Sequence, residues 1–472
     1  MKTLQKDDLS SLRSLLRGEV ITPGDAHYDA ARAVYNAMID RRPAAIARCV
    51  DVADVIASVN FARGNVLPLA VRGGGHSGPG LGVCDSGLVI DLSAMRGIRV
   101  DPSARTVHAA GGCTWGDLDH ATHPFGLAVP GGFISTTGIG GLTLGGGVGY
   151  LSRTYGLTID NLLSVDMVLA DGSFVVANEA HNSDLFWAVR GGGGNFGVVT
   201  GFEYRLNRAS NVYGGPMLWP MEEARAVMTD WRDLILKAPE ALNGWFGFLI
   251  VPPAPQFPQE WHLKTMCAVV WCHLGTREEA EAALAPFRVA HPPALDFAGP
   301  LPWPALQSIF DELFKPGLQW YWKSDFVTDL GEEAIDLHLR HGAKLPTMLS
   351  TMHLYAINGA AHRLTAGDTA FAYRHANFVQ LIGAISPDPA DNERMIAWAK
   401  DYWQALHPYS AGGGYINMNM EETEDRIRAS YGGNYARLAA IKAKYDPDNL
   451  FRVNQNILPA SAAVPPPASA GM

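Results

Sequence analysis

Charged residues are scarce in this sequence. They make up 18% of its 472 residues, whereas an average soluble protein contains about 25%. Lys and Arg number 37 against 47 Asp and Glu, so the formal charge is −10, and no run of basic residues occurs. Because binding to nucleic acid depends on neutralising phosphates with basic side chains, we expect no nucleic-acid partner. The hydrophobic fraction of 47% excludes a disordered chain and predicts a globular protein.

Long apolar runs are missing as well. No stretch of about 18 apolar residues occurs, and the first residues, from Met1 to Asp8, lack the apolar core of a signal peptide. We therefore expect no contact with a membrane and a cytoplasmic location.

Cysteine is rare and shows no functional spacing. The five cysteines form no Cys-x-x-Cys pair, and an odd number fits buried thiols better than a disulfide framework. No His-Glu-x-x-His motif and no Cys/His cluster occurs among the fifteen histidines. We therefore predict no metal site and buried thiols at Cys49, Cys84, Cys113, Cys267 and Cys272.

Glycine, by contrast, is abundant. It accounts for 50 residues, about one in nine, against a usual share of about 7%. Glycine is favoured where φ is positive or where the main chain approaches a ligand closely. Nearly all glycine clusters lie between residues 72 and 201, separated by short β-like runs such as 67–71 and 88–92. A helix after Asp51 and a hairpin over 164–176 complete the pattern of this region.

The composition divides the chain into four parts. Residues 1–206 have the pattern of an α+β domain built from two lobes. From 207 to 411 glycine becomes rarer and Trp, Pro and Met more frequent, which predicts a second domain with an aromatic interior and a helix after Asp391. Residues 412–458 return to glycine and end in a helix that stops near Pro447. Residues 459–472 form a Pro- and Ala-rich tail that we predict to be disordered.

Several interpretations compete for the glycine clusters. Flexible linkers are disfavoured, because apolar β-like runs rather than polar spacers flank the clusters. A phosphate-binding P-loop would end in Gly-Lys-Ser/Thr, which does not occur. A Rossmann site is disfavoured, because the run from Gly138 to Thr143 lacks the third glycine and no ribose-binding acid follows about 20 residues later. Backbone N–H groups in tight turns still suit a pyrophosphate, and the third possibility is a flavin held between two glycine-rich lobes, for which the specific residues of these segments are decisive.

Four segments carry a family resemblance, and they follow one another in the family's order. They are residues 71–77, with three glycines before His76; the glycine-rich residues 138–149; residues 184–197, with four consecutive glycines; and residues 445–457, which include Asp446-Pro447 and Asn454-Gln455. In these segments the sequence resembles the FAD-linked oxidases of the vanillyl-alcohol oxidase superfamily (FAD-binding PCMH-type), and within it the berberine-bridge-enzyme-like group. The resemblance covers nearly the whole chain.

The resemblance implies an α+β fold, in which a two-lobed FAD-binding domain is joined to a substrate domain with an antiparallel sheet covered by helices. It also implies FAD bound covalently through His76 to the flavin 8α-methyl group. A neutral imidazole beside a glycine nest suits that position, and a histidine tether raises the flavin reduction potential. The other residues expected to hold FAD are Arg72, Gly73, Gly74, Gly75, Ser77, Gly132, Thr136, Thr137, Gly138, Gly140, Gly141, Gly145, Gly149, Gly194, Gly197, Val198, Asn454 and Gln455.

The sequence departs from the family at three positions. Many relatives have a second tether through a cysteine where this chain has Ile134, so we expect one covalent bond, with Cys113 packed in a different turn. Leu142 stands where berberine bridge enzyme has a histidine near the flavin, so the substrate chemistry of that enzyme is not transferred. Thr137 takes the place of a valine that controls oxygen access in relatives, and its alternative role is a hydrogen-bonded turn residue.

The family places a catalytic base in a C-terminal segment that corresponds here to Tyr415-Ile416-Asn417. Removal of an O–H proton requires a base that faces the reacting carbon, and we predict Tyr415 as that base. A tyrosine needs a cationic or donor neighbour to lower its pKa, and Lys323 is a candidate, although we favour a surface lysine beside an aromatic cluster. His353 and Asn358 lie on one strand-like run, and we favour a structural role for both over a place in the pocket.

The resemblance implies an oxidase in which a CH–OH, CH–NH or activated C–H donor gives a hydride to flavin N5, with oxygen as the final acceptor and hydrogen peroxide as product. We expect a small-molecule substrate that is bulky and aromatic, alkaloid-like or polyketide-like, because the second domain is rich in aromatic residues. A carbohydrate oxidase, a nicotinamide-dependent dehydrogenase and a non-catalytic flavoprotein stay open as alternatives.

Overall fold

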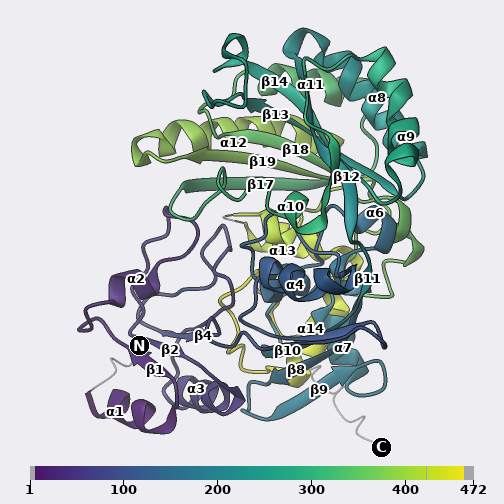
Figure 1. The fold of residues 1–472 in the computed structure, drawn as a ribbon. Helices are drawn as coiled ribbons and strands as arrows, with labels where there is room; N and C mark the ends of the chain where they lie inside the picture. The colour runs from purple at the N-terminus through teal and green to yellow at the C-terminus, as the bar shows by residue number, and fades with distance from the viewer. Residues whose placement is uncertain (1–5, 421, 462–472) are drawn as a thin grey trace, which may run out of the picture.

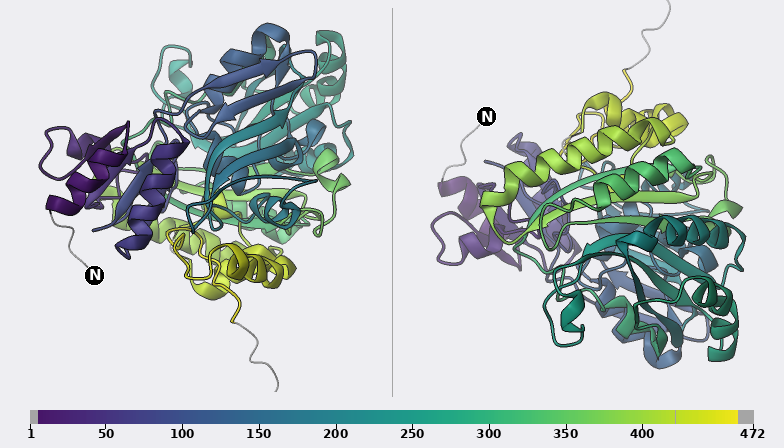
Figure 2. Two further views of the ribbon diagram at one scale, coloured as in Figure 1. Left: turned by 90° about the horizontal axis from the view of Figure 1, so that it is seen from below. Right: turned by 90° about the horizontal axis from the view of Figure 1, so that it is seen from above.

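The structure is a computed structural model that describes residues 6–420 and 422–461. One large sheet with helices on its outer face lies above two smaller sheets in Figure 1, and the two views of Figure 2 show the N-terminal lobe at one side of the molecule. The predicted tail, residues 459–472, lies outside the described residues from 462 onward.

The N-terminal lobe contains a four-stranded sheet in the order β1-β2-β4-β3. Its central strands are parallel, and β1 pairs with β2 in the antiparallel sense. The predicted helix after Asp51 is confirmed as α3, because the Asp51 carboxylate accepts a hydrogen bond from the Asp54 N–H and caps the helix. The elements of this lobe are α1 (Lys6–Leu15), β1 (Glu19–Ile21), α2 (Tyr28–Arg32), β2 (Ala45–Arg48), α3 (Val52–Gly64), β3 (Leu69–Arg72) and β4 (Leu88–Asp91).

The second lobe contains a five-stranded antiparallel sheet in the order β5-β6-β10-β8-β9. The predicted hairpin is confirmed, since β8 and β9 pair on either side of a turn at Gly172, whose φ is +84°. The elements are β5 (Ile98–Asp101), β6 (Thr106–Ala110), α4 (Trp115–Thr122), β7 (Leu127–Ala128), α5 (Ile139–Leu144), α6 (Ser152–Tyr155), β8 (Leu162–Val168), β9 (Phe174–Asn178), α7 (Ser183–Val189) and β10 (Val198–Arg205), with β11 (Asn207–Arg208) paired to β7.

The large sheet is antiparallel throughout, in the order β15-β12-β14-β13-β18-β19-β17 with β16 beside β12. Its strands are β12 (Asn211–Pro220), β13 (Leu242–Ile250), β14 (Thr265–His273), β15 (Leu295–Asp296), β16 (Gly299–Pro302), β17 (Gln319–Val327), β18 (Thr351–Ala356) and β19 (Phe378–Ser386). The helices between them are α8 (Ala224–Lys237), α9 (Arg277–Ala290), α10 (Trp303–Gln307), α11 (Glu332–Gly342) and α12 (Asn392–Leu406). The helix predicted after Asp391 is thus confirmed as α12.

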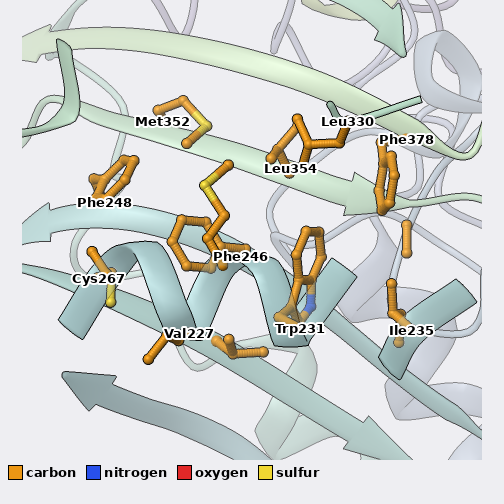
Figure 3. Packing of buried hydrophobic residues seen from close by; sticks show 14 of the residues in the cluster. Val227, Trp231, Ile235, Phe246, Phe248, Cys267, Leu330, Met352, Leu354 and Phe378 are labelled. Atoms are coloured by element: carbon orange, nitrogen blue, oxygen red, sulfur yellow. The ribbon is translucent and has the colours of Figure 1, made fainter. Parts of the chain in front are cut away.

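The two faces of the large sheet bury different side chains, because successive residues of a strand point to opposite faces. Met352 and Leu354 of β18 pack with Trp231 of α8 in the core between the sheet and helices α8, α9, α11 and α12 (Figure 3). The alternate residue Tyr355 belongs instead to a second core that includes Phe133 and Tyr150 of the second lobe. The predicted α+β fold, with an antiparallel sheet covered by helices, is confirmed.

The C-terminal segment, with α13 (Glu424–Tyr431) and α14 (Tyr435–Tyr445), returns to the second lobe beside α7 (Figure 1). A fully buried ion pair anchors it: Lys442 Nζ lies 2.5 Å from Asp446 Oδ2 and donates to the Asn195 carbonyl at 2.7 Å. The Asp446 carboxylate also accepts hydrogen bonds from the N–H groups of Leu450 and Phe451, so it fixes the turn that ends α14.

Substitution of Lys442 tests this anchor. Lys442→Leu leaves the Asp446 carboxylate buried without its cation, so we expect the free energy of unfolding to fall by about 3–5 kcal/mol in denaturant titrations. Lys444→Leu is the matched control, because Lys444 pairs with Asp184 at 2.7 Å on an exposed surface, where solvent screens the interaction and such pairs contribute little to stability. Equal effects of the two substitutions would contradict this account of the anchor.

All five cysteines are buried, as predicted. Within residues 6–420 and 422–461, no group of three or more His, Cys, Asp and Glu side chains is arranged to hold a metal ion. In the same part of the chain, no helix has the length and hydropathy required to cross a bilayer.

Candidate active site

A cavity of about 300 Å³ lies between the glycine-rich lobes and the large sheet. Its two halves differ in composition. One half, here called the glycine half, is lined by Gly73, Gly74, Gly75, Gly82, Gly111, Gly138, Gly140, Gly141, Gly193, Gly194 and Gly197. The other half, here called the aromatic half, is lined by Phe133, Trp245, Phe310, Phe314, Trp320, Trp322 and Tyr355. Backbone therefore dominates one half and aromatic rings the other.

The glycine half depends on close contact between two loops. A Cβ atom on Gly74 would lie 2.4 Å from the Gly138 nitrogen, and one on Gly138 would lie 2.4 Å from the Gly74 nitrogen. No side chain fits at either position, so the loops can meet only as glycines. At Gly141 a Cβ would meet no protein atom within 4 Å, although this residue lines the cavity. The space beside Gly141 is therefore free for a ligand.

His76 lies at the cavity with both ring nitrogens engaged. Its Nε2 is 3.0 Å from Thr136 Oγ1, and its Nδ1 is 3.4 Å from Thr137 Oγ1. The imidazole stacks on the Tyr35 ring with centroids 3.7 Å apart and an interplanar angle of 23°. Burial lowers the pKa of His76 to about 3, so the imidazole is neutral at physiological pH and one nitrogen keeps a lone pair. Tyr35 and the two threonines fix the direction in which that lone pair points.

Tyr415 is buried at the cavity with 2% of its surface exposed. Its phenolic oxygen accepts hydrogen bonds from the Gly147 N–H at 2.9 Å and from Asn417 Nδ2 at 3.0 Å. Burial raises the pKa of Tyr415 to about 12, and these two donors oppose the rise because they stabilise the phenolate. Asn417 is held in turn by a bond from its Nδ2 to the Leu142 carbonyl at 3.0 Å.

Lys323 does not contact Tyr415. It is buried rather than exposed, and its Nζ lies 2.8 Å from Glu422 Oε1 and donates to the Met420 carbonyl at 2.9 Å. Our interpretation of Lys323 as a surface residue was wrong. Its burial could not be predicted locally, because the partners that compensate its charge lie almost a hundred residues later in the chain. The donors that act on Tyr415 are instead a backbone N–H and an amide.

His353 lines the aromatic half of the cavity, whereas Asn358 does not. Asn358 accepts a hydrogen bond from Arg153 Nε at 2.8 Å and donates to the Ile235 carbonyl at 3.1 Å, so its role is structural as predicted. His353 combines both roles, since it lines the cavity and its ring nitrogens are bonded to Thr351 and Tyr355. Its ring packs on Trp245 with centroids 4.3 Å apart, on the face of the sheet that closes the cavity.

Most residues expected to hold FAD lie on the cavity lining. Four do not: Thr136, Gly145, Gly149 and Val198. Thr136 contacts His76 as described above. A Cβ on Gly145 would lie 2.2 Å from Asn417 Oδ1, and one on Gly149 would lie 1.9 Å from the Gly131 carbonyl, so both glycines allow close packing behind the cavity. Val198 is buried in the core of the N-terminal lobe, and its neighbour Val199 lines the cavity instead.

Sequence reasoning missed several lining residues, among them Tyr35, Phe310, Phe314, Thr351 and Tyr355. The alternation of Thr351, His353 and Tyr355 could have predicted that these three residues line one wall together, since residues two apart on a strand share a face. Tyr35 gave no signal, because its contact with His76 joins segments that only the fold brings together. Ile134 also lines the cavity, so the position of the second tether in relatives is apolar here.

Comparison with known proteins identifies what this chain is similar to. A family model described as "FAD binding domain" matches residues 43–178, and one described as "Berberine and berberine like" matches residues 414–458. An FAD-linked oxidoreductase of Dictyostelium discoideum is 31% identical over 90% of this chain and 91% of that protein. The (R)-6-hydroxynicotine oxidase of Paenarthrobacter nicotinovorans is 30% identical over 94% of this chain and 97% of its own length.

The fold agrees with these matches. The crystal structure of 6-hydroxy-D-nicotine oxidase from Arthrobacter nicotinovorans superposes with a TM-score of 0.84, at 29% identity, over 94% of this chain and 98% of that one. Both family models fall on segments that line the cavity: the first contains His76 and Gly138, and the second contains Tyr415 and Asn454.

Proposed function

Because this chain belongs to the berberine-bridge-enzyme-like group of FAD-linked oxidoreductases, we propose that it is an oxidase with FAD attached covalently through His76 and with a bulky aromatic substrate. The observation that carries the proposal is the continuous cavity, in which the glycine half passes directly into the aromatic half. His76 and Tyr415 both lie on its lining.

The residues present fit FAD. The glycine half offers backbone N–H groups and a space beside Gly141 that no protein atom fills, as a dinucleotide in an acidic protein requires. The neutral imidazole of His76 provides a nucleophilic nitrogen for the tether. When bound, FAD supplies a hydride acceptor at N5 and a route for electrons to oxygen, with hydrogen peroxide as product.

The chain's own residues have separate tasks in this reaction. Tyr415 takes the proton of the substrate hydroxyl or amine, and the donors at Gly147 and Asn417 stabilise the phenolate that this role requires. The aromatic half orients a planar substrate and excludes water from the reacting atoms. Ile134 presents no nucleophile at the cavity, so the tether is single.

Gly141→Ala tests whether the cofactor occupies the glycine half. The added methyl group meets no protein atom, so the free energy of unfolding of the cofactor-free chain stays unchanged or rises by up to about 1 kcal/mol. The methyl group enters the space assigned to FAD, so we expect the visible flavin absorbance per purified chain to fall at least severalfold. Gly97→Ala is the control, since a Cβ there also meets nothing within 4 Å and Gly97 lies away from the cavity. Full flavin content in both variants would place FAD elsewhere.

A panel of donors tests the reaction itself. Release of hydrogen peroxide is measured with phenolic alcohols, cyclic amines, polyketide-like phenols and oligosaccharides at equal concentration. We expect the aromatic donors to give the strongest response. A response confined to oligosaccharides would assign the chain to carbohydrate oxidation, and no response from any donor, with slow reoxidation of the chemically reduced flavin, would indicate a non-catalytic flavoprotein.

A further inference from the structure

Three polar side chains line the aromatic half of the cavity from a single strand. They are Thr351, His353 and Tyr355 of β18, here called the β18 strip. Each is at least 94% buried, and their spacing of two residues puts them on the face of the sheet opposite helix α8. Their neighbours on this wall are aromatic or aliphatic, and the other polar groups there are the indole N–H donors of Trp245, Trp320 and Trp322. The β18 strip therefore supplies the hydrogen-bond acceptors of the large sheet at the cavity.

The direction of each hydrogen bond along the β18 strip follows from chemistry. Thr351 Oγ1 lies 2.7 Å from the Phe248 carbonyl, which can only accept, so the single hydroxyl proton of Thr351 points there. Thr351 Oγ1 must then accept from His353 Nε2 at 2.8 Å, which puts the imidazole proton on Nε2. The bare Nδ1 is an acceptor, so Tyr355 donates its hydroxyl proton to it at 2.6 Å.

The phenolic oxygen of Tyr355 has one hydrogen-bonding position that no residue in the described ranges uses. The phenolic proton of Tyr355 is committed to His353, and its oxygen accepts no hydrogen bond from any residue in the described ranges. A phenolic oxygen can still accept one. Tyr355 therefore offers the cavity an acceptor and not a donor.

Packing holds the β18 strip in place. The His353 ring lies against Trp245, and a Cβ on Gly247 would be only 2.9 Å from His353 Cδ2, so the imidazole occupies space that the glycine vacates. The Tyr355 ring stacks on Phe133 with centroids 4.0 Å apart and an angle of 19°. Neither ring can turn to reverse the hydrogen bonds without breaking these contacts.

Charge is absent from the same wall. Among the described residues that line the cavity, the side chain with a permanent charge is Arg72, which lies on the glycine half and pairs with Asp91 at 2.8 Å. Burial lowers the pKa of His353 to about 3, so this histidine is neutral as well. A charged ligand in the aromatic half would find no counter-ion, which favours an uncharged one.

We propose that Tyr355 is a specificity-determining residue whose oxygen accepts a hydrogen bond from a hydroxyl group on an uncharged aromatic substrate. His353 and Thr351 are positioning residues, because they fix Tyr355 as an acceptor. The inference rests on the proposed function, which it narrows from bulky aromatic compounds to neutral hydroxylated ones. An oligosaccharide is disfavoured, because its many hydroxyl groups would outnumber the polar partners on this wall, which are the β18 strip and the indole N–H groups of Trp245, Trp320 and Trp322.

The test is a binding titration of the flavin-loaded enzyme under anaerobic conditions, with the heat of binding measured by calorimetry. The probes are 2-naphthol and 2-methoxynaphthalene, which share an aromatic frame and differ in the O–H group. One hydrogen bond to a buried acceptor is worth about 1–1.5 kcal/mol, so we expect the wild type to bind the naphthol about tenfold more tightly. Tyr355→Phe should remove this preference and leave binding of the methyl ether unchanged.

Two further variants separate recognition from folding. Tyr150→Phe is the matched control, because Tyr150 packs against Phe133 in the same cluster but lies off the cavity lining, and it should keep the preference. His353→Leu frees the Tyr355 hydroxyl to donate, so the methyl ether should gain affinity and the preference should shrink or reverse. A purely structural role for His353 would weaken both probes equally.

The proposal is overturned if the wild type binds the two probes equally, if it binds neither, if it binds xylobiose more tightly than either, or if Tyr355→Phe keeps the preference. Failure of the proposed function has a different signature. It would appear as no peroxide release from any donor, while the binding preference and its loss in Tyr355→Phe persist.

Discussion

Replacing His76 with alanine will leave no flavin on the protein after acid denaturation. Precipitation of the wild type with acid should give a yellow pellet, whereas the His76→Ala pellet should be colourless with its flavin in the supernatant. The expected effect is complete, because within the described residues the cavity lining holds no cysteine and its other histidine, His353, lies on the aromatic half, away from the glycine half assigned to FAD. The measurement is flavin absorbance of the pellet redissolved in denaturant, per mole of chain.

The control for this experiment is His108→Ala, which removes a histidine beside Asp166 away from the cavity and should keep the yellow pellet. A yellow pellet from His76→Ala would show that another residue forms the tether. A colourless pellet from the wild type would refute covalent attachment while leaving FAD binding intact, because free FAD is released by denaturation. The two failures are thus distinct.

Tyr415→Phe should lower kcat by about 10²–10⁴-fold, the usual contribution of a positioned proton acceptor. The substitution removes only the phenolic oxygen, and the ring keeps its contacts with Phe326 and Phe371. Flavin content and KM should therefore change little. The measurement is steady-state peroxide release with the best donor from the panel, together with flavin absorbance per chain.

The pH profile gives an independent check on Tyr415. Because its pKa is raised to about 12, the phenolate is a minor species near neutral pH, and its population grows about tenfold for each pH unit. We expect kcat of the wild type to rise with pH through the alkaline range, and the Tyr415→Phe profile to be flat there. Tyr204→Phe is the control, since Tyr204 is fully buried and bonded to Thr143 but lies outside the cavity lining. A full-rate Tyr415→Phe enzyme would exclude this residue as the base.

The sequence was most informative where function depends on short segments. Loops that approach as closely as those at Gly74 and Gly138 need residues without a Cβ atom, and the clustering of glycine in the sequence indicates such close approach. Helix α3 was predictable because Asp51 caps it locally. In each case the physical cause lies within a few residues of its effect or is a property of the residue type.

The sequence was least informative where the burial or orientation of a side chain depends on partners that are distant in the chain. Lys323 is buried because Glu422 compensates its charge, and no residue near Lys323 in the sequence predicts that partner. His353 looked like a core histidine in an apolar run, and only the pairing of β18 between β13 and β19 turns it toward the cavity. Tyr35 stacks on His76 across loops whose approach depends on the whole lobe.

The ion pair between Lys442 and Asp446 also bears on the order in which the cavity is assembled. His76 on one side of the cavity and Tyr415, Asn454 and Gln455 on the other are far apart in the sequence, so no single segment encloses this space. Domains fold as units, and this cavity is complete only when α14 docks through the buried pair. A fragment that contains the loop with His76 but lacks α14 should therefore be unable to enclose the cofactor.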